Sequence, residues 1–277
     1  MRLFELYILS FFRYLRYYFW AHTKYDVHSP YVADFLEHTC GDDRWFYVFS
    51  TAEILRKRLL QDRTKLAVTD LGAGSAIFDS NHRRLCDVVS HTAISPALGR
   101  LLFRIVYWHK PATLLELGTS VGISAIYQAS AALEAAMITI EGDPALAQLA
   151  RGHLQEAGLE QVKVVEGDFQ VALPGALQVL KKLDYLYVDG DHRADRTLAY
   201  FNQCMAFAHE GSLFVFADIH WSSDMERAWE TIRRDPRVTI SVDLYDFGLL
   251  FFRKENKEQQ HFTLIRAKWK PWRMGFF

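Results

Sequence analysis

The pattern of hydrophobic and polar positions changes near residue 112 of the chain. Beyond it, short apolar runs alternate with stretches that have apolar residues at helical spacing. Helical patterns separate the first five of these runs, an alternation typical of a parallel sheet with right-handed helical crossovers. The last runs lie close together, which indicates an antiparallel ending. The expected strands are 113–117, 137–141, 162–166, 185–188, 212–217, 239–244, 249–252 and 262–265.

The part of the chain before residue 112 has a mainly helical pattern. Helices are expected over about 31–38 and 51–62, and over 83–109 with a break near Ser95-Pro96, whereas 66–82 have an irregular pattern. We therefore expect two parts. Residues 1–92 form a helical N-terminal extension, and residues 93–277 form an α/β domain in which 93–111 are the joining segment.

The first segment is rich in aromatic residues: ten of the first 25 residues are Phe, Tyr or Trp. Its apolar positions recur at helical spacing and predict an amphipathic helix. We expect this helix to pack on its own domain, with a homodimer contact or a weak membrane-surface contact as alternatives. No signal peptide or transmembrane segment is expected. The apolar positions are Phe4, Ile8, Phe11, Phe12, Leu15, Tyr18 and Phe19.

Composition narrows the class of protein. Half of the 277 residues are hydrophobic and 23% are charged, which is typical of a globular protein. The net charge of −1 gives no electrostatic reason to expect a nucleic-acid partner. The three cysteines are scattered and form no C-x-x-C pair. The sequence therefore predicts neither a disulfide framework nor a zinc knuckle, and we expect a cytoplasmic protein.

A glycine turn follows the first strand of the α/β part, in the run Glu116-Leu-Gly-Thr-Ser-Val-Gly122-Ile-Ser124. Gly118 permits a tight turn and close approach of a ligand, and Gly122 lets the next helix pack near the strand. The run lacks G-x-G-x-x-G, because serine and isoleucine stand at positions 120 and 123. The carboxylate of Glu116 would repel a phosphate but suits an ammonium group or a bound water. A cofactor without phosphates is therefore favoured.

Polar clusters close each of the next four strands. Because ligands bind at the carboxyl ends of the strands in open α/β sheets, these clusters predict one site. The carboxylate of Glu141 can accept from both hydroxyls of a ribose, Asp168 can accept from an adenine amino group, and Phe169 can cover the ring. The clusters are Glu141, Gly167-Asp168-Phe169, Asp189-Gly-Asp-His192 and Asp218-Ile-His220.

Together these motifs over residues 112–221 resemble class I S-adenosylmethionine-dependent methyltransferases, in particular catechol-type and related small-molecule O-methyltransferases of a bacterial branch. Asp-Gly-Asp-His resembles the fourth-strand motif of a branch that modifies sugars and natural products. The resemblance implies a Rossmann-like, mostly parallel sheet of seven strands with an antiparallel final strand. It implies O-methylation of a small-molecule acceptor with S-adenosyl-L-methionine. The residues it assigns to the cofactor are Glu116, Gly118, Thr119, Ser120, Gly122, Ser124, Glu141, Gly167, Asp168, Phe169 and Asp189.

Methyl transfer to a hydroxyl needs a group that removes the proton. His192 is the first candidate, since a nearby carboxylate can orient its ring, and His220 is the second. Catechol-type relatives hold Mg²⁺, and Asp189 and Asp218 match the first two ligand positions. Ile219 stands at the third and cannot coordinate, so Mg²⁺ is possible but a metal-free base is favoured.

A second glycine run, Val68-Thr-Asp-Leu-Gly72-Ala-Gly74-Ser75, also looks like a methyltransferase first motif. Polar residues follow it instead of an apolar helix, so we expect it to be a loop.

Two other functions remain as alternatives. One is a nicotinamide-dependent Rossmann enzyme, which the missing second glycine disfavours. The other is a non-catalytic cofactor-binding or membrane-associated module, suggested by the aromatic first segment.

Overall fold

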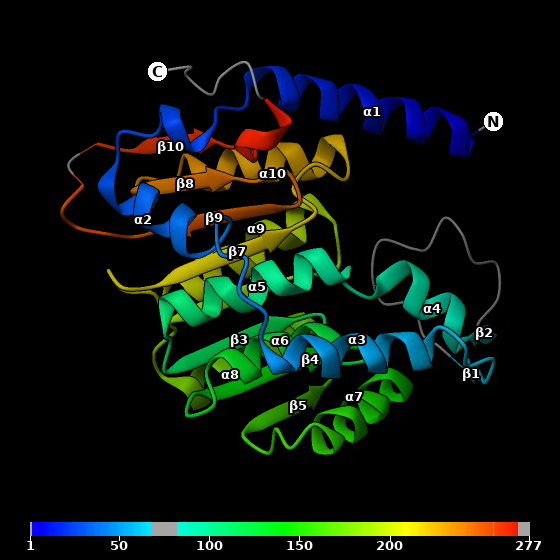
Figure 1. Cartoon of the computed structure of the whole chain (residues 1–277). Coiled ribbons are helices and arrows are strands. Elements are labelled where there is room, and N and C mark those ends of the chain that lie inside the picture. The colour runs from blue at the N-terminus through cyan, green and yellow to red at the C-terminus, as the bar shows by residue number, and fades with distance from the viewer. Residues whose placement is uncertain (1, 68–81, 257, 271–277) are drawn as a thin grey trace.

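A central sheet of eight strands organises the protein, a computed structural model of which describes residues 2–67, 82–256 and 258–270 (Figure 1). The strands lie in the order β10-β8-β9-β7-β6-β3-β4-β5. Their bounds are β3 Thr113–Leu117, β4 Ala136–Glu141, β5 Val162–Glu166, β6 Tyr185–Val188, β7 Leu213–Ala217, β8 Ile240–Asp243, β9 Phe247–Phe251 and β10 Gln260–Thr263.

The predicted α/β class and mostly parallel sheet are confirmed, with two differences in detail. The sheet has eight strands instead of seven, and the antiparallel strand is β9, the last but one. A turn of only three residues joins β8 to β9, so β9 must run back antiparallel between β7 and β8. The true final strand, β10, then pairs parallel with the outer side of β8.

Helices cover both faces of the sheet. Alternate residues of each central strand point to opposite faces, so Leu114 and Tyr187 belong to one buried cluster and Leu115 and Val188 to the other. The first face is covered by α2 Pro30–His38, α3 Tyr47–Leu59, α4 Leu85–Thr92, α5 Pro96–His109, α6 Ile123–Ala131 and α7 Pro144–Glu156. The second is covered by α8 Phe169–Leu180, α9 Ala194–Met205 and α10 Ser223–Arg233.

The helices before residue 92 share their core with the sheet. Phe35 of α2 and Phe49 of α3 are fully buried in the same cluster as strand residues such as Leu114. The division of the chain at residue 92 therefore stays a prediction. The helix break is confirmed, since the side chain of Ser95 accepts a hydrogen bond from the amide of Leu98 and Pro96 starts α5.

The segment expected to be irregular has short strands at its ends. β1 (Lys65–Ala67) and β2 (His82–Arg84) pair antiparallel. The second glycine run, 68–75, lies outside the described residues.

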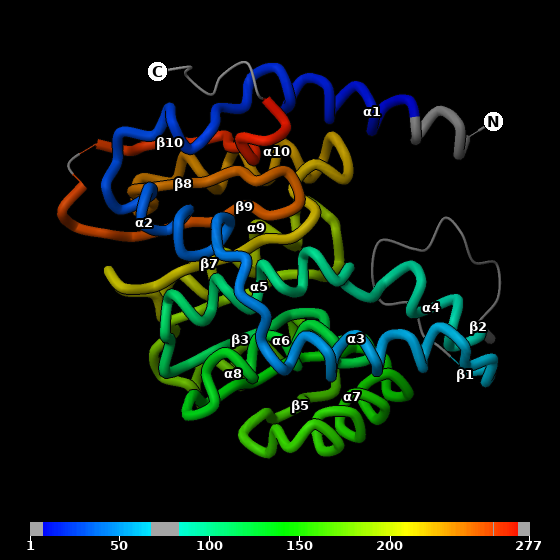
Figure 2. The backbone as a smooth tube through the Cα atoms, in the orientation of Figure 1, coloured from blue at the N-terminus to red at the C-terminus, as the bar shows by residue number. Residues whose placement is uncertain are grey.

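The first helix, α1 (Arg2–Trp20), lies along one edge of the molecule beside β10 and α10 (Figure 2). The Tyr17 hydroxyl donates to the carbonyl of Leu264, and Arg16 forms an ion pair with Glu226 of α10 at 2.6 Å. These contacts confirm that the helix packs on its own domain. Much of its apolar stripe faces away from the domain, however, because Phe11, Phe12 and Phe19 are exposed. A different face of the helix makes the contacts.

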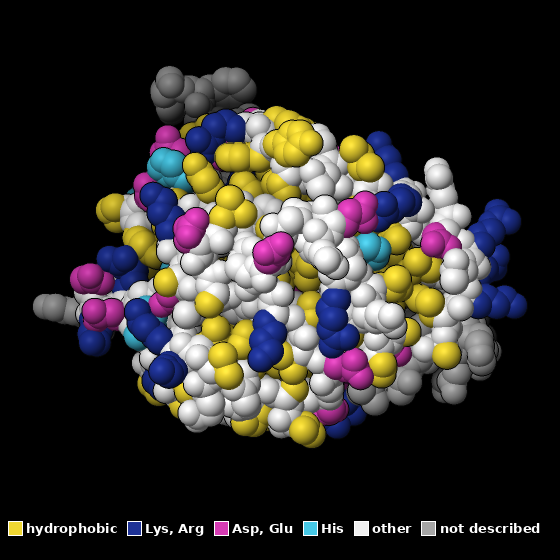
Figure 3. All heavy atoms as spheres, turned by 90° about the horizontal axis from the view of Figure 1, so that it is seen from below, with side chains coloured by type: hydrophobic (Ala, Val, Ile, Leu, Met, Phe, Trp, Pro, Cys, Tyr) yellow, Lys and Arg dark blue, Asp and Glu magenta, His cyan; other side chains and the backbone are white. Residues whose placement is uncertain are grey.

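The face of the molecule shown in Figure 3 has the mixture of charged and hydrophobic side chains that is usual for a protein surface. Basic and acidic side chains are interspersed over it, and hydrophobic atoms lie between them in separate areas.

Candidate active site

The turn after β3 lies directly against the turn after β6. Gly118 has a φ of +102°, and a Cβ there would lie 2.1 Å from the backbone oxygen of Asp189. The amide of Asp189 donates to the carbonyl of Leu117 at 2.8 Å. Only glycine permits both this φ and this approach. The predicted cofactor turn and the Asp189-to-His192 motif are thus brought together.

The turn after β3 also packs against α7. Gly122 caps the N-terminus of α6 with a φ of +87°, and a Cβ there would lie 3.3 Å from Cα and Cβ of Ala150 in α7. The role expected for Gly122, close helix packing, matches this geometry. The hydroxyl of Ser120 lies 2.9 Å from that of Thr92, at the end of α4. The N-terminal part of the chain therefore contacts this turn, which the sequence patterns did not indicate.

Glu116 is fully buried beneath the turn, so its expected contact with an ammonium group or a bound water stays a prediction. Its carboxylate accepts from Gln128 at 2.6 Å and from the Thr139 hydroxyl at 2.5 Å. The Thr139 oxygen is also 2.5 Å from that of Thr119, which is buried as well. Burial raises the pKa of Glu116 to about 7. Ser124 is buried nearby, so Glu116, Thr119 and Ser124 support the turn from below.

Glu141 ends β4 and holds two backbone amides. One carboxylate oxygen accepts from the amide of Ser120 at 2.7 Å and the other from that of Asp143 at 2.9 Å. Burial raises the pKa of this carboxyl, and these hydrogen bonds oppose the change. Since each carboxylate oxygen has two lone pairs, one on each remains to accept from a ligand. Glu141 thus ties the glycine turn to β4.

The cluster after β5 contacts the cluster after β6. The amide of Gly167 donates to the Glu141 carbonyl at 2.9 Å. Asp168 caps α8 by accepting from the amide of Gln170 at 2.8 Å, and it lies 3.3 Å from Arg196. A Cβ on Gly190 would lie 2.9 Å from the ring of Phe169, which shows how closely that ring covers the turn.

The strongest convergence of chemically active groups lies at the ends of β6 and β7. One ligand atom each of Asp189, His192 and Asp218 lie within 4.8 Å of one another. His192 Nε2 is 3.6 Å from the Asp218 carboxylate, and the Tyr187 hydroxyl donates to Asp189 at 2.8 Å. This convergence agrees with the sequence-based prediction of one site, although the roles of its residues are untested.

Like charges oppose ionisation in this cluster. Desolvation and then the neighbouring Asp189 raise the pKa of Asp218 to about 6, and desolvation raises that of Asp189. Asp246, in the turn between β8 and β9, is a further member that the sequence patterns missed. Desolvation and then Asp218 raise its pKa to about 6. The amide of Asp218 donates to the Asp246 carbonyl at 2.9 Å, so the two turns are joined.

Asp191 lies between Asp189 and His192 and stabilises the turn after β6 through its hydrogen bonds. It adopts a left-handed φ of 53°, which aspartate tolerates better than most residues. Its carboxylate accepts from Arg193 at 2.5 Å and from the Tyr200 hydroxyl at 2.8 Å, and Arg196 is 3.4 Å away. Ser120 and Asp218 have left-handed φ values of 48° and 54°. Such backbone is concentrated at functional turns.

His220, the second candidate base, is engaged on both ring nitrogens. Nδ1 is 2.8 Å from Glu226 and Nε2 is 2.9 Å from Asp243, and the ring stacks on Tyr245. The two carboxylates outweigh desolvation and raise the pKa of this imidazole. A histidine with both nitrogens occupied joins α10 to β8 and has no free nitrogen for an acceptor.

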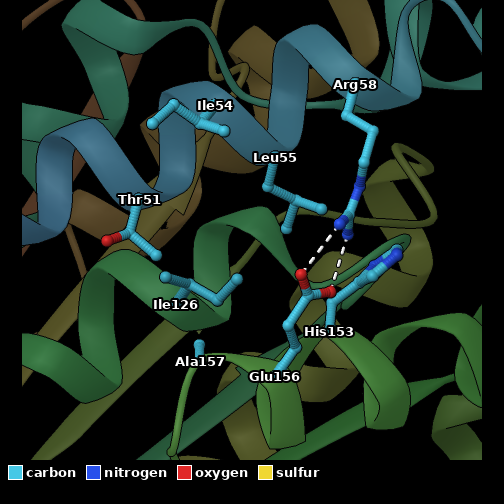
Figure 4. Close-up of a pocket in the computed structure, with 8 residues that line it drawn as sticks. All are labelled: Thr51, Ile54, Leu55, Arg58, Ile126, His153, Glu156 and Ala157. Carbon is cyan, nitrogen blue, oxygen red and sulfur yellow. Dashed lines mark hydrogen bonds and ion pairs between the residues drawn. The ribbon is translucent and has the colours of Figure 1, made fainter.

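A hollow elsewhere on the molecule lies between α3 and α7, apart from the strand ends (Figure 4). Its walls are mainly apolar, and the Arg58–Glu156 ion pair at 2.7 Å crosses one end. His153, which also lines it, has Nδ1 2.8 Å from the Val121 carbonyl. None of the residues that line it belongs to the His192 cluster.

Comparisons with known proteins show which sequences and folds this chain resembles. Residues 115–219 match the family model described as a methyltransferase domain. A stretch of 92 residues is 33% identical to a transmembrane O-methyltransferase of Propithecus coquereli, covering 32% of this chain and 33% of that protein. The chain thus matches about a third of the length of this relative.

Solved structures show the same fold. The O-methyltransferase of Bacillus cereus, in complex with SAH, has a TM-score of 0.55 at 16% identity and covers 81% of this chain and 97% of that one. The O-methyltransferase TomG of Streptomyces achromogenes, in complex with SAM, has a TM-score of 0.51 at 24% identity over 58% of this chain and 82% of that one. Residues 115–219 thus match a methyltransferase domain model, and the chain has the fold of these solved O-methyltransferases.

Proposed function

We propose that this protein transfers a methyl group from S-adenosylmethionine to a hydroxyl oxygen of a small molecule. The observation that carries the proposal is the convergence of Asp189, His192 and Asp218 beside the Gly118 turn. A cofactor on that turn and an acceptor beside His192 would be neighbours. The methyltransferase match over residues 115–219 supports this activity over the nicotinamide-dependent alternative.

The cofactor is proposed to lie across three strand ends. The turn from Gly118 to Gly122 would surround the methionine part, Glu141 would accept from the ribose hydroxyls, and Asp168 with Phe169 would contact the adenine. The hydrogen bonds from the Ser120 and Asp143 amides to Glu141 support its part, because they fix the carboxylate in place before a ligand arrives.

The reaction would be an in-line displacement with His192 as base. The acceptor oxygen forms a bond to the methyl carbon, the bond from sulfur to that carbon breaks, and the hydroxyl proton passes to the imidazole. The products are the methyl ether and S-adenosylhomocysteine. Asp218, 3.6 Å from Nε2, would stabilise the imidazolium that forms. Holding the two reactants in line would supply much of the rate.

A divalent cation is a second way to activate the acceptor at the same place. The position of the expected third ligand holds Ile219, which is buried in the core, but His192 brings a nitrogen within reach of the two carboxylates. Asp189, His192 and Asp218 therefore fit a cation, with one nitrogen in a set that for Mg²⁺ is usually all oxygen. A bound cation would supply Lewis-acid activation of the hydroxyl.

The activity is tested by incubating the full chain with methyl-labelled S-adenosylmethionine and panels of phenols, sugars and other alcohols. Label is expected in an ether product of at least one panel. Equal turnover after exhaustive treatment with chelator would support His192 as a metal-free base, and loss restored by a divalent ion would support the cation. Label found only on amines would contradict oxygen as the acceptor atom.

The remaining expectations on partners and location stay predictions. Within the described ranges, none of the helices is both long and apolar enough to cross a bilayer. A homodimer and a cytoplasmic location are untested, and the exposed face of α1 is considered below.

A further inference from the structure

The outward face of α1 is apolar, the reverse of the usual arrangement for a surface helix. Six large hydrophobic residues on it are between 39% and 75% exposed, and helical spacing places them on one side of the helix. Arg16, four residues from both Phe12 and Trp20, lies among them. Apolar surface of this kind marks a contact site more often than isolated exposed residues do. The residues of this outer face are Ile8, Leu9, Phe11, Phe12, Phe19 and Trp20.

Specific contacts hold the outer face outward. Tyr17, on the opposite side of the helix, is buried and donates to the carbonyl of Leu264. Arg13 donates to the carbonyl of Trp221 at 3.2 Å, and Arg16 pairs with Glu226 at 2.6 Å. At the end of the helix, the buried ammonium of Lys270 donates to the carbonyls of Phe19 and Ala21 at 3.3 and 2.6 Å. The orientation of the helix is therefore fixed by Tyr17 and Arg13 on its inner side and by Lys270 at its end. Arg16 reaches Glu226 from the outer side.

The charges around the C-terminal end of α1 are mainly basic. Lys24 follows the helix, and Arg266 and Lys268 flank the segment that contacts it through the hydrogen bond from Tyr18 to the Trp269 carbonyl. All three basic residues are exposed, and Trp269 is exposed as well. Asp26, the nearby acid, already accepts from the amide and hydroxyl of Thr23. Exposed aromatic and basic side chains thus lie together at the C-terminal end of α1.

This charge pattern distinguishes between the possible partners. A two-fold dimer could cover the apolar residues of the outer face, but it would supply no group of opposite charge for the basic residues at the end of the helix, because the same patch meets itself. An anionic lipid surface would instead complement them, and Trp and Phe side chains are suited to the region between head groups and acyl chains. We propose that α1 docks on an anionic bilayer surface, with its axis in the plane of the membrane and its outer face among the lipids.

Docking through α1 would also determine how the candidate site lies relative to the membrane. Arg13 links α1 to Trp221, whose ring centroid lies 6.3 Å from that of His192. Docking through α1 would therefore place the His192 cluster beside the bilayer. The docking itself does not rest on the methyltransferase activity, because the outer face, its fixed orientation and its charges are independent of the site.

Vesicle flotation of the full chain tests this docking directly. The probes are phosphatidylcholine vesicles and vesicles that also contain phosphatidylserine. The test variant is Phe12→Glu with Phe19→Glu, and the matched control is Leu133→Glu with Val179→Glu, two exposed apolar residues away from α1. Circular dichroism and binding of S-adenosylhomocysteine report whether each variant is folded and whether the cofactor site is intact.

The wild-type chain and the control are expected to float with phosphatidylserine vesicles, and the test variant to need at least about tenfold more lipid. Quenching of Trp20 fluorescence by brominated lipid, assigned with Trp20→Phe, is expected in the wild-type chain and does not depend on the test variant folding. Failure of the wild-type chain to float, or equal flotation of the test variant, would overturn the proposal. So would a dimer in sedimentation velocity that Phe12→Glu with Phe19→Glu dissociates, since a second copy would then be the partner.

Discussion

The turn after β3 and the ends of β6 and β7 contact each other, but the carboxylates of the two regions differ in how they are hydrogen-bonded. Under and beside the turn, the carboxylates of Glu116 and Glu141 accept short hydrogen bonds on both oxygens. At the ends of β6 and β7, desolvation raises the pKa of both Asp189 and Asp218, and Asp189 raises that of Asp218 further. His192 lies 3.6 Å from Asp218, beyond hydrogen-bond distance.

We propose that this difference separates the region that binds the cofactor from the region that carries out the reaction. A carboxylate with fixed partners has a fixed position, which favours recognition of a ligand that always has the same shape. An imidazole that is close to a carboxylate but not hydrogen-bonded to it can instead exchange a proton with a substrate. The predictions below change one region at a time and ask whether binding and turnover separate.

The largest effect is expected for His192→Ala. If the imidazole accepts the acceptor's proton, kcat should fall by about 10² to 10⁴, while affinity for S-adenosylhomocysteine stays within about twofold. The measurement is labelled methyl transfer alongside calorimetry. His38→Ala, at an exposed histidine of α2, is the control and should match the wild-type chain. A His192→Ala variant with unchanged turnover would remove the base from the account.

Gly118→Ala should disrupt the contact between the two regions. A methyl group would meet the backbone of Asp189 at 2.1 Å on a residue with a φ of +102°, so we expect a loss of roughly 2–5 kcal/mol of stability. Denaturant unfolding measures it. Gly152→Ala is the matched control, since nothing lies within 4 Å of its Cβ position in α7, and it should gain about 0.5–1 kcal/mol. Equal stability of the two variants would contradict the close approach.

Glu116→Gln tests the buried carboxyl beneath the turn through the pH dependence of the unfolding free energy. Folding raises the pKa of Glu116 from 4.5 to about 7, so its carboxyl is protonated in both the folded and the unfolded state below pH 4.5 and costs nothing there. As pH rises to 7 the unfolded state is favoured, by up to roughly 3 kcal/mol. The glutamine variant should therefore gain stability over the wild-type chain between pH 4.5 and 7. A difference in unfolding free energy that is the same at pH 5 and pH 8 would contradict this.

Local patterns in the sequence were enough to predict much of the fold. The alternation of apolar runs and helical patterns predicted the parallel sheet, and the glycines at 118 and 122 predicted the turn. Both features depend on residues that are close together in the sequence. The position of Glu141 at a strand end was predictable for the same reason, and it lies against the glycine turn. The extra strand β10 was within the predicted runs, but the resemblance to seven-stranded relatives did not include it.

What could not be predicted depends on partners that are distant in the chain. Glu116 is buried because Gln128 and Thr139, 12 and 23 residues away, meet it. His220 is occupied because Asp243, 23 residues away, reaches its second nitrogen. The period of α1 gave its apolar stripe, but only the contact of Tyr17 with Leu264 fixes the side that faces the domain.

The central claim is that the region of fixed carboxylates binds S-adenosylmethionine, and calorimetry with S-adenosylhomocysteine tests it most directly. The wild-type chain should bind at about micromolar Kd, and Glu141→Gln should weaken binding by about 10- to 100-fold, the loss of roughly 1–3 kcal/mol expected for hydrogen bonds to a charged group. Glu166→Gln is the matched control, because Glu166 is the register partner of Glu141 at the end of β5 but lies on the surface beside Arg151; it should bind as the wild-type chain does. No binding to the intact wild-type chain, or equal weakening by both substitutions, would contradict the account.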